Sequence, residues 1–220
     1  MANKGNSGHI KKLHAPAYFG AGRKGSKYVT RPNPGRHTLT RSVPLSLVLK
    51  KMAITATARE SRRAIVSGSV SVNGRQVRNQ KYPVGLGDVV GAGGSSSRIW
   101  INRQGRIELG EAGGSGLLYK VVGKYKGRGG NIMIRLHDGT VMGADGKVSV
   151  NDSVFVKDGK IEKHMQLAPG VECMVIDGVH LGAKGRIVQV VAGNMHKAKS
   201  VIIEDGPDKF ETLVRNIMVS

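Results

Sequence analysis

The sequence is poor in the residues that carry disulfides, metal clusters and large aromatic cores. Its 220 residues include one cysteine, Cys173, so a disulfide within the chain and a multi-cysteine zinc site are both excluded. Cys173 stands in an apolar run, which predicts a buried thiol. With three Phe and one Trp, any core must be aliphatic and modest. No apolar run approaches the roughly 18 residues of a membrane span and no secretory segment is evident, which predicts a cytosolic protein without a membrane partner.

Acidic residues are missing from the first 41 residues, which hold nine Lys and Arg. Residues 171–220 hold six cations and six acids, so with a formal charge of +20 for the chain the remainder carries 20 − 9 = 11. Such a charge is typical of nucleic-acid binding proteins. A membrane-surface protein or a solubility device is the alternative, but neither explains why the charge is placed so unevenly.

No arrangement of residues indicates catalysis. The seven histidines are scattered without His-x-x-x-His spacing, and no paired carboxylates share a pattern that would form a pocket. The glycine-rich stretch 20–27 lacks the Gly-Lys-Ser/Thr order of a nucleotide-binding loop. We therefore expect no enzyme activity, no metal, no cofactor and no small-molecule substrate.

Periodic patterns in residues 44–90 predict two short helices. In the first, apolar residues recur at i, i+4 and i+7: Leu45, Leu49 and Met52. A capping box formed by Thr57 and Glu60 begins the second helix. This helix should run to about Ser67 and end at Gly68, since glycine readily adopts the left-handed conformation.

The second helix has two different faces. Ala58 and Ile65 are predicted to face inward, whereas the i, i+3, i+4 spacing gathers three arginines on the outer face: Arg59, Arg62 and Arg63. Alternating valines and an Asn73-Gly74 turn then predict a hairpin in a small sheet that also carries Arg75 and Arg78. Two helices with a basic face beside this sheet would suit a phosphate backbone.

The same stretch resembles a known RNA-binding family. Residues 62–74, followed by Tyr82-Pro83-Val84 and Gly87-Asp88-Val89-Val90, resemble the S-four RNA-binding domain. That domain occurs in ribosomal proteins, pseudouridine synthases and some tRNA synthetases, so the resemblance implies RNA binding without specifying a task. The residues alone also fit a generic helix-helix-sheet module with an exposed basic face.

The chain after residue 90 predicts an all-β structure. Residues 91–97 have the composition of a flexible connector. Five Asp-Gly pairs then punctuate short apolar runs, a spacing that suits small barrels. Strands are expected at 117–122, 132–136, 154–156, 171–176, 200–203 and 210–214. The basic glycine loop at 124–130, which contains Tyr125, is interpreted as an RNA contact or as a solvated loop.

Residues 169–188 resemble a KOW motif, the strand-loop-strand element of small SH3-like barrels. Gly178, Gly182 and Gly185 would permit a tight loop close to RNA, with His180 and other basic residues free to face it. Alternatively, the glycines serve only the turns of the barrel, and the zero net charge of this segment favours that possibility.

The N-terminal segment is the most specific. Residues 1–41 lack periodicity and should become ordered only against a partner. Residues 8–16 and 31–39, followed by Val43-Pro44-Leu45, resemble the small-subunit ribosomal protein S-four-e family of archaea and eukaryotes. This family more often has Trp where the chain has Tyr18-Phe19.

The resemblance implies a multi-domain α+β protein with four parts: a basic extended arm (1–42), an S-four domain (43–92), a central β domain (93–168) and a KOW SH3-like barrel (169–220). It implies a structural constituent of the cytoplasmic small ribosomal subunit, with small-subunit rRNA and neighbouring small-subunit proteins as partners. The alternative is an RNA-binding assembly or translation factor outside the mature ribosome. The expected RNA-binding residues are His9, Lys11, Lys12, Arg31, Arg36, His37, Lys50, Lys51, Arg59, Arg62, Arg63, Arg75, Arg78, Lys124, Lys126, Arg128, His180, Lys184 and Arg186.

Overall fold

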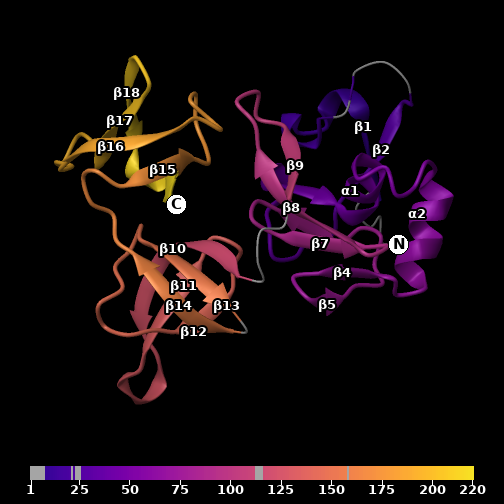
Figure 1. Ribbon diagram of the computed structural model, residues 1–220, viewed down its shortest axis with the longest axis horizontal. Helices are drawn as coiled ribbons and strands as arrows, with labels where there is room; N and C mark the ends of the chain where they lie inside the picture. Colours follow the sequence, from indigo (N-terminus) through magenta and orange to yellow (C-terminus); the bar gives the residue numbers. More distant parts are fainter. Residues whose placement is uncertain (1–7, 21, 23–25, 112–115, 158) are drawn as a thin grey trace, which may run out of the picture. The chain divides into compact units, whose positions relative to one another are not determined.

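The structure is a computed structural model that describes residues 8–20, 22, 26–111, 116–157 and 159–220. It divides into two compact units. Unit 1 comprises Met1–Trp100 with Arg106–Gly113, and unit 2 comprises Ile101–Gly105 with Gly114–Ser220. Both α-helices belong to unit 1, whereas the described part of unit 2 is built from strands, turns and short 3₁₀ segments (Figure 1).

The N-terminal segment packs against the rest of unit 1. Strand β1 (His9–Lys11) pairs with β2 (Tyr28–Thr30) in a two-stranded antiparallel sheet. Tyr18 and Phe19 are buried, and Phe19 is fully inaccessible to solvent. The sequence predicted that this segment would order only against a partner, but this aromatic pair gives its described part a core contact within the chain. Three 3₁₀ turns complete it: η1 (Lys12–His14), η2 (Ala17–Phe19) and η3 (Leu39–Arg41).

Two helices follow in the order that the sequence predicts. Helix α1 (Leu45–Lys51) buries the apolar stripe formed by Leu45, Val48 and Leu49. Helix α2 (Ala58–Val66) begins with the predicted capping box and ends one residue earlier than expected, with Ser67 as its C-cap and Gly68 at φ 83°.

The inner face of α2 differs from the prediction at one position. Ile65 is buried as expected, but Ala58 is exposed. Ser61 takes the inner place instead, because its hydroxyl is satisfied by Thr57 O at 3.0 Å and by the Thr55 hydroxyl at 2.7 Å. A serine with two such partners can be buried without the usual penalty.

A five-stranded antiparallel sheet completes unit 1, and a second, two-stranded sheet lies beside the N-terminus of α1. The Asn73-Gly74 turn forms as predicted, with φ of 51° and 78°. The larger sheet has the order β5 (Arg75–Gln76), β4 (Val70–Val72), β7 (Val89–Ala92), β8 (Ser95–Ile101) and β9 (Ile107–Glu111). The smaller one pairs β3 (Ser42–Pro44) with β6 (Pro83–Gly85).

This sheet continues across the predicted boundary between residues 92 and 93. The stretch 91–97, expected to be a flexible connector, is the hairpin of β7 and β8, with Gly93 and Gly94 at the turn at φ 59° and 82°. Strand β9 and all of β8 except Ile101 therefore lie in unit 1. Composition misled the prediction because serine and glycine fill both linkers and exposed hairpins.

In unit 2 the central β domain is organised by the long strand β10 (Leu117–Lys126). Its first half pairs with β13 and its second half with β11, with a bulge between Val121 and Gly123. Val121, Ile134 and Val154 are fully buried in its core. The sheet order is β12 (Val141–Gly143), β11 (Ile132–Leu136), β10, β13 (Ser153–Lys157) and β14 (Lys160–Met165).

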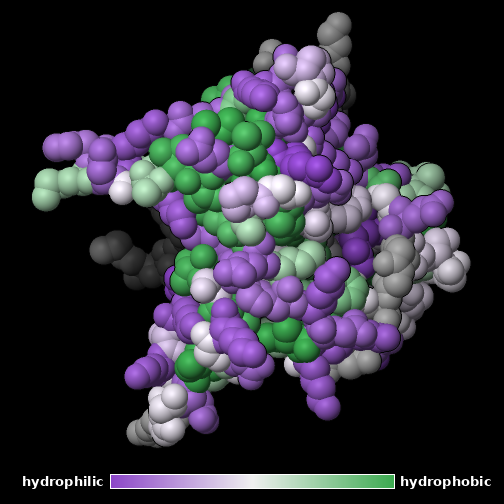
Figure 2. Space-filling view, turned by 60° about the vertical axis from the view of Figure 1, so that its left-hand side comes forward, coloured by the Kyte–Doolittle hydropathy of each residue, from purple (hydrophilic) through white to green (hydrophobic). Residues whose placement is uncertain are grey.

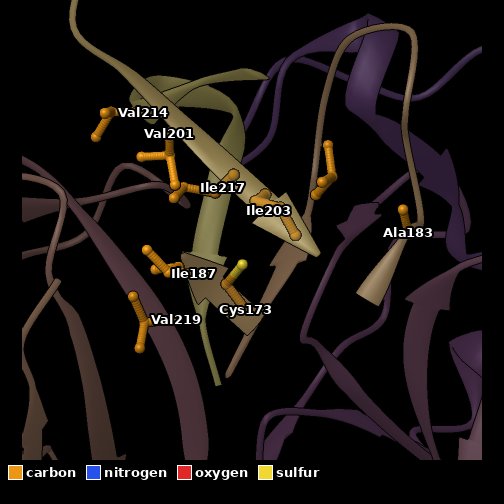
Figure 3. Packing of buried hydrophobic residues seen from close by; sticks show 9 residues of the cluster. Cys173, Ala183, Ile187, Val201, Ile203, Val214, Ile217 and Val219 are labelled. Carbon is orange, nitrogen blue, oxygen red and sulfur yellow. The ribbon is translucent and has the colours of Figure 1, made fainter. Parts of the chain in front are cut away.

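The C-terminal module has the small antiparallel β fold predicted for an SH3-like barrel. Cys173 lies in its aliphatic core with Ile203 and Ile217 (Figure 3), and burial raises the pKa of the thiol to about 11. The predicted buried cysteine is confirmed. The sheet order is β18 (Asp208–Leu213), β17 (Ser200–Asp205), β16 (Lys184–Val191), β15 (Glu172–Val175) and β19 (Ile217–Val219), with η5 (Val214–Asn216) before the last strand.

A buried lysine joins the central domain to this module. Lys120 of β10 is 2% exposed, and its Nζ donates hydrogen bonds to Val214 O at 2.8 Å and Ile217 O at 2.6 Å. A third hydrogen bond has its donor in the C-terminal module: Val219 N donates to Ser153 Oγ of the central domain at 3.0 Å. The two parts of unit 2 therefore share polar contacts that exclude water.

Candidate nucleic-acid interface

The outer face of α2 carries three exposed arginines, as the sequence predicts. Arg59, Arg62 and Arg63 have no carboxylate within ion-pair distance among the described residues. Val66, one further turn along the same face, is 57% exposed. The face therefore offers three guanidinium groups around a short apolar side chain, which suits phosphates and the edge of a ribose.

The one acid in α2, Glu60, caps the N-terminus of the helix. The Glu60 carboxylate accepts hydrogen bonds from Ala56 N at 2.9 Å and Thr57 N at 3.3 Å, and Thr57 Oγ1 accepts one from Glu60 N. The hydrogen bond from Ala56, followed by those of Thr57, lowers the pKa of Glu60 below its ordinary value. Its charge stabilises the N-terminus of the helix.

The β4–β5 hairpin extends this face. The Gln76 side chain donates a hydrogen bond to Gly68 O at 2.6 Å, which holds the hairpin against the C-terminal end of α2. Arg75 and Arg78 are exposed there. We call the set of five arginines the basic surface: Arg59, Arg62, Arg63, Arg75 and Arg78.

The two lysines of α1 differ in their environment. Lys50 is exposed, whereas Lys51 is half-buried and its Nζ donates a hydrogen bond to Ile107 O at 3.1 Å. Burial and then the charge of Arg106 lower the pKa of Lys51. Lys51 is thus partly committed to holding β9, and Lys50 is the freer of the two toward RNA.

The predicted RNA-binding residues of the N-terminal segment differ in their exposure to solvent. His9 and Lys11 are exposed, and the His9 ring meets Tyr28 edge-on at 4.6 Å between centroids. Lys12, Arg31 and Arg36 are half-buried.

His37 requires a correction. It is 7% exposed, and its Nε2 lies 2.9 Å from Asp88 Oδ2. A Cβ on Gly85 would stand 2.5 Å from the His37 ring, so the glycine makes room for it. His37 therefore cannot reach RNA from this position. The sequence placed it in a basic run, but its partner lies 51 residues away.

Asp88 is the centre of this buried network. Its carboxylate also accepts hydrogen bonds from Gly85 N at 2.9 Å and from the Asn73 side chain at 2.6 Å. Burial alone would raise the pKa of Asp88, but the hydrogen bonds and the charge of His37 outweigh it and leave the pKa below its ordinary value. The network fastens the N-terminal segment to the sheet.

The β10–β11 hairpin holds the predicted glycine loop. Tyr125 is 48% exposed and Lys126 is exposed, whereas Lys124 Nζ donates a hydrogen bond to Gly146 O at 2.7 Å. Arg128 lies in η4 (Arg128–Gly130), and its side chain is outside the described part of the structure. An aromatic ring beside a cation suits stacking on an unpaired base.

In the C-terminal module, two of the three predicted RNA-binding residues lie beside other side chains of the module. The His180 ring stacks on Phe210 at 4.1 Å between centroids. Lys184 and Arg186 are exposed, but Glu172 and Glu204 stand opposite Arg186 on the neighbouring strands.

Two of its glycines have structural roles. A Cβ at Gly185 would clash with Glu204 O, and one at Gly182 with Asn102 O. These positions need glycine because two backbones approach closely there, which matches the alternative in which the glycines serve the module itself.

The part of the chain that carries the basic surface is similar to a known domain. Residues 43–90, which contain the basic surface, match the family described as S4 domain. The chain is 32% identical over 217 residues to the small ribosomal subunit protein eS4 of Methanocella arvoryzae, across 96% of this chain and 93% of that protein. The chain belongs to the eS4 family.

Further eS4 proteins agree with this assignment. The eS4 protein of Methanocaldococcus jannaschii is 30% identical over 234 residues, across 100% of this chain and 96% of that protein. The crystal structure of the 30S ribosomal protein S4e from Thermoplasma acidophilum matches with a TM-score of 0.71 and 27% identity, over 81% of this chain and 94% of that chain. The family predicted from the arm and the S-four motif is confirmed.

Two further cations of the chain lie outside the motifs quoted from the sequence. Lys81 lines a hollow with the segment 31–39, and Arg135 is exposed opposite Gly123. Neither belongs to a basic run, so only alternation along a strand could have indicated Arg135, and no local signal indicates Lys81. On the face drawn in Figure 2, hydrophilic side chains are interspersed with smaller hydrophobic areas.

The described residues show neither a metal cluster nor a membrane helix. No three His, Cys, Asp or Glu side chains among them lie close enough to hold a metal ion. Within the same part of the chain, none of the helices has the length and hydropathy needed to cross a bilayer.

Proposed function

We propose that the chain is a structural constituent of the small ribosomal subunit and binds small-subunit rRNA through the basic surface. One observation carries this proposal: a capped helix inside the matched S4 domain presents three exposed arginines that form no ion pair with an acid among the described residues. The eS4 relatives are named as small ribosomal subunit proteins, and a net charge of +20 supports an RNA partner.

The binding works by neutralising phosphates. Arginines displace condensed counterions from the RNA, and their release drives association. Because the helix is fixed by its cap and by Ile65, little order is lost when the face meets RNA. Duplex RNA would be recognised by its shape and backbone, since its major groove is too narrow to read.

The other partners belong to the same proposal. Neighbouring small-subunit proteins would contact the remaining surface, in the ribosome of the cytoplasm, and the protein would catalyse no reaction. The exposed residues outside the basic surface that we retain as RNA contacts are His9, Lys11, Lys50, Lys126, Lys184 and Arg186.

Co-sedimentation tests the proposal. Tagged protein expressed in cells should remain with mature small subunits through a high-salt wash, because buried multi-site contacts dissociate slowly. Loss of the protein in the wash, or its confinement to precursor particles, would instead identify an assembly or translation factor.

A further inference from the structure

A hollow lies between the segment 31–39 and Lys81, and none of the five arginines of the basic surface lines it. Its volume is about 500 Å³, within the range of about 300–1,000 Å³ that is usual for ligand pockets. Arg31, Arg36 and Lys81 contribute to its lining, and no acidic side chain is among its described lining residues. The hollow therefore combines the size of a ligand site with a positive potential.

The frame of this hollow is fixed before any ligand arrives. Asn33 N donates a hydrogen bond to Lys81 O at 2.8 Å, and Arg31 N donates one to Gly8 O at 3.3 Å. His37, which also lines the hollow, is held by Asp88, with 2.9 Å between Nε2 and Oδ2. Pro32 and Pro34 stiffen the same turn. A ligand would not need to order this segment, so the entropic cost of binding is small.

The chemistry of the lining has two parts. The Lys81 ammonium lies near Gly8, since a Cβ on Gly8 would be 2.6 Å from Nζ, and both residues line the hollow. Pro34 and Leu39 add apolar surface, and Leu39 is 37% exposed. Cations and apolar groups in one hollow match a phosphate joined to a ring, whereas a free phosphate would leave most of the volume unfilled.

We propose that this hollow binds one unstacked nucleotide of rRNA. The phosphate lies between Arg31 and Lys81, and the base packs against Pro34 and Leu39. Sequence-specific RNA recognition commonly uses such splayed nucleotides, because their faces are free to pack against side chains. This inference rests on the proposed function, and it assigns to the N-terminal segment a task separate from that of the basic surface.

Titration of the full chain with adenosine 5′-monophosphate and with inorganic phosphate, followed by amide NMR shifts, tests the pocket. The nucleotide should shift the amides of Arg31, Thr38 and Lys81 in a saturable way, and phosphate alone should bind at least about tenfold more weakly. The double variant Arg31→Gln/Lys81→Gln should lower nucleotide affinity about tenfold or more, as expected for the loss of charge-assisted hydrogen bonds.

Lys160→Gln/Lys163→Gln is the matched control, since it removes the same charge from β14 at two exposed lysines outside the predicted RNA contacts. It should leave nucleotide affinity unchanged, and thermal melts should show both variants folded. Equal losses in both variants, a response to phosphate as strong as to the nucleotide, or no saturable shift would overturn the pocket.

A crosslinking experiment separates this failure from failure of the proposed function. Small subunits containing 4-thiouridine should yield an rRNA crosslink on a peptide that covers residues 31–39. If the chain crosslinks to rRNA through other peptides but not through this one, the nucleotide proposal fails while the proposed function stands. If the chain binds no rRNA at all, both fail.

Discussion

At the scale of single residues, two positions combine strain or burial with a compensating set of hydrogen bonds. Asp88 is 2% exposed and holds three partners, and Ala53 adopts φ 57° after α1. The left-handed conformation costs a residue with a Cβ roughly 1–2 kcal/mol. Both positions can be tested by substitutions that change one group and leave the surroundings intact.

Asp88→Asn should lower stability and alter its pH dependence. The pKa of Asp88 is lower in the folded chain, so the unfolded chain binds the proton more readily. The contribution of Asp88 is therefore complete above about pH 4 and is lost as the pH falls through the folded-state pKa. We expect a loss of about 2–4 kcal/mol at pH 7 and a smaller further loss in acid than in the unmodified chain.

Urea unfolding from pH 3 to pH 7 measures both quantities. Asp208→Asn, at the exposed first residue of β18, is the control and should leave the curve unchanged. If Asp88→Asn keeps the acid-dependent loss of the unmodified chain, the buried network does not contribute in the way described.

Ala53→Gly should raise stability by roughly 0.5 kcal/mol. Glycine adopts positive φ without strain, and this gain exceeds its extra entropy in the unfolded chain. The hydrogen bonds Ala53 N to Lys50 O at 3.1 Å and Ile54 N to Leu49 O at 3.3 Å do not involve the methyl group. Ala56→Gly, at negative φ, should instead lower stability, and the urea midpoints of the two variants should move in opposite directions.

At the scale of elements, α2 is the unit that function depends on. Its capping box and Ile65 fix the helix, so the outer face can change without loss of the fold. The basic surface would act as a set of independent phosphate contacts, which predicts a specific dependence on salt.

Arg59→Gln/Arg62→Gln/Arg63→Gln should flatten the plot of log affinity for small-subunit rRNA against log salt. Each lost phosphate contact removes about 0.7–0.9 from the slope, so the triple variant should lose roughly two to three units. Exposed helix substitutions of similar propensity change stability by only about 0.5 kcal/mol.

The matched control is Lys157→Gln/Lys160→Gln/Lys163→Gln on β13 and β14, where three exposed cations lie outside the predicted RNA contacts. An equal loss of slope in this control would mean that total charge, and not the face of α2, governs binding. Ile65→Asp provides the opposite case, because it buries a charge and should unfold the domain.

At the scale of the whole molecule, Lys120 decides whether the two parts of unit 2 act together. Lys120→Met keeps the length of the side chain but leaves Val214 O and Ile217 O without this donor, at a cost of about 2–4 kcal/mol. We expect the single unfolding transition of unit 2 to broaden or split in calorimetry. Lys126→Met, on the exposed part of the same strand, should change neither its midpoint nor its width.

Local rules predicted the parts of this fold that depend on neighbours in sequence. The Thr57–Glu60 box placed α2 to within one residue, and Asn73-Gly74 placed its hairpin. Features that depend on distant residues could not be predicted. The burial of His37 depends on Asp88, 51 residues away, and on the absence of a side chain at Gly85. The pairing of β7 with β8 is local, and it was mistaken for a linker because serine and glycine are common in both linkers and hairpins.

The His37–Asp88 contact also sets an order of events during synthesis. The N-terminal segment leaves the ribosome first, yet its buried partner is made 51 residues later. The segment must therefore stay undocked, with its cations exposed to any RNA nearby, until residue 88 has emerged. Stalled nascent chains that expose residues only to about 80 should be cut by protease within 31–39, and chains that expose residues to about 115 should resist. A segment that is translated early thus docks only after the residues that hold it have been made.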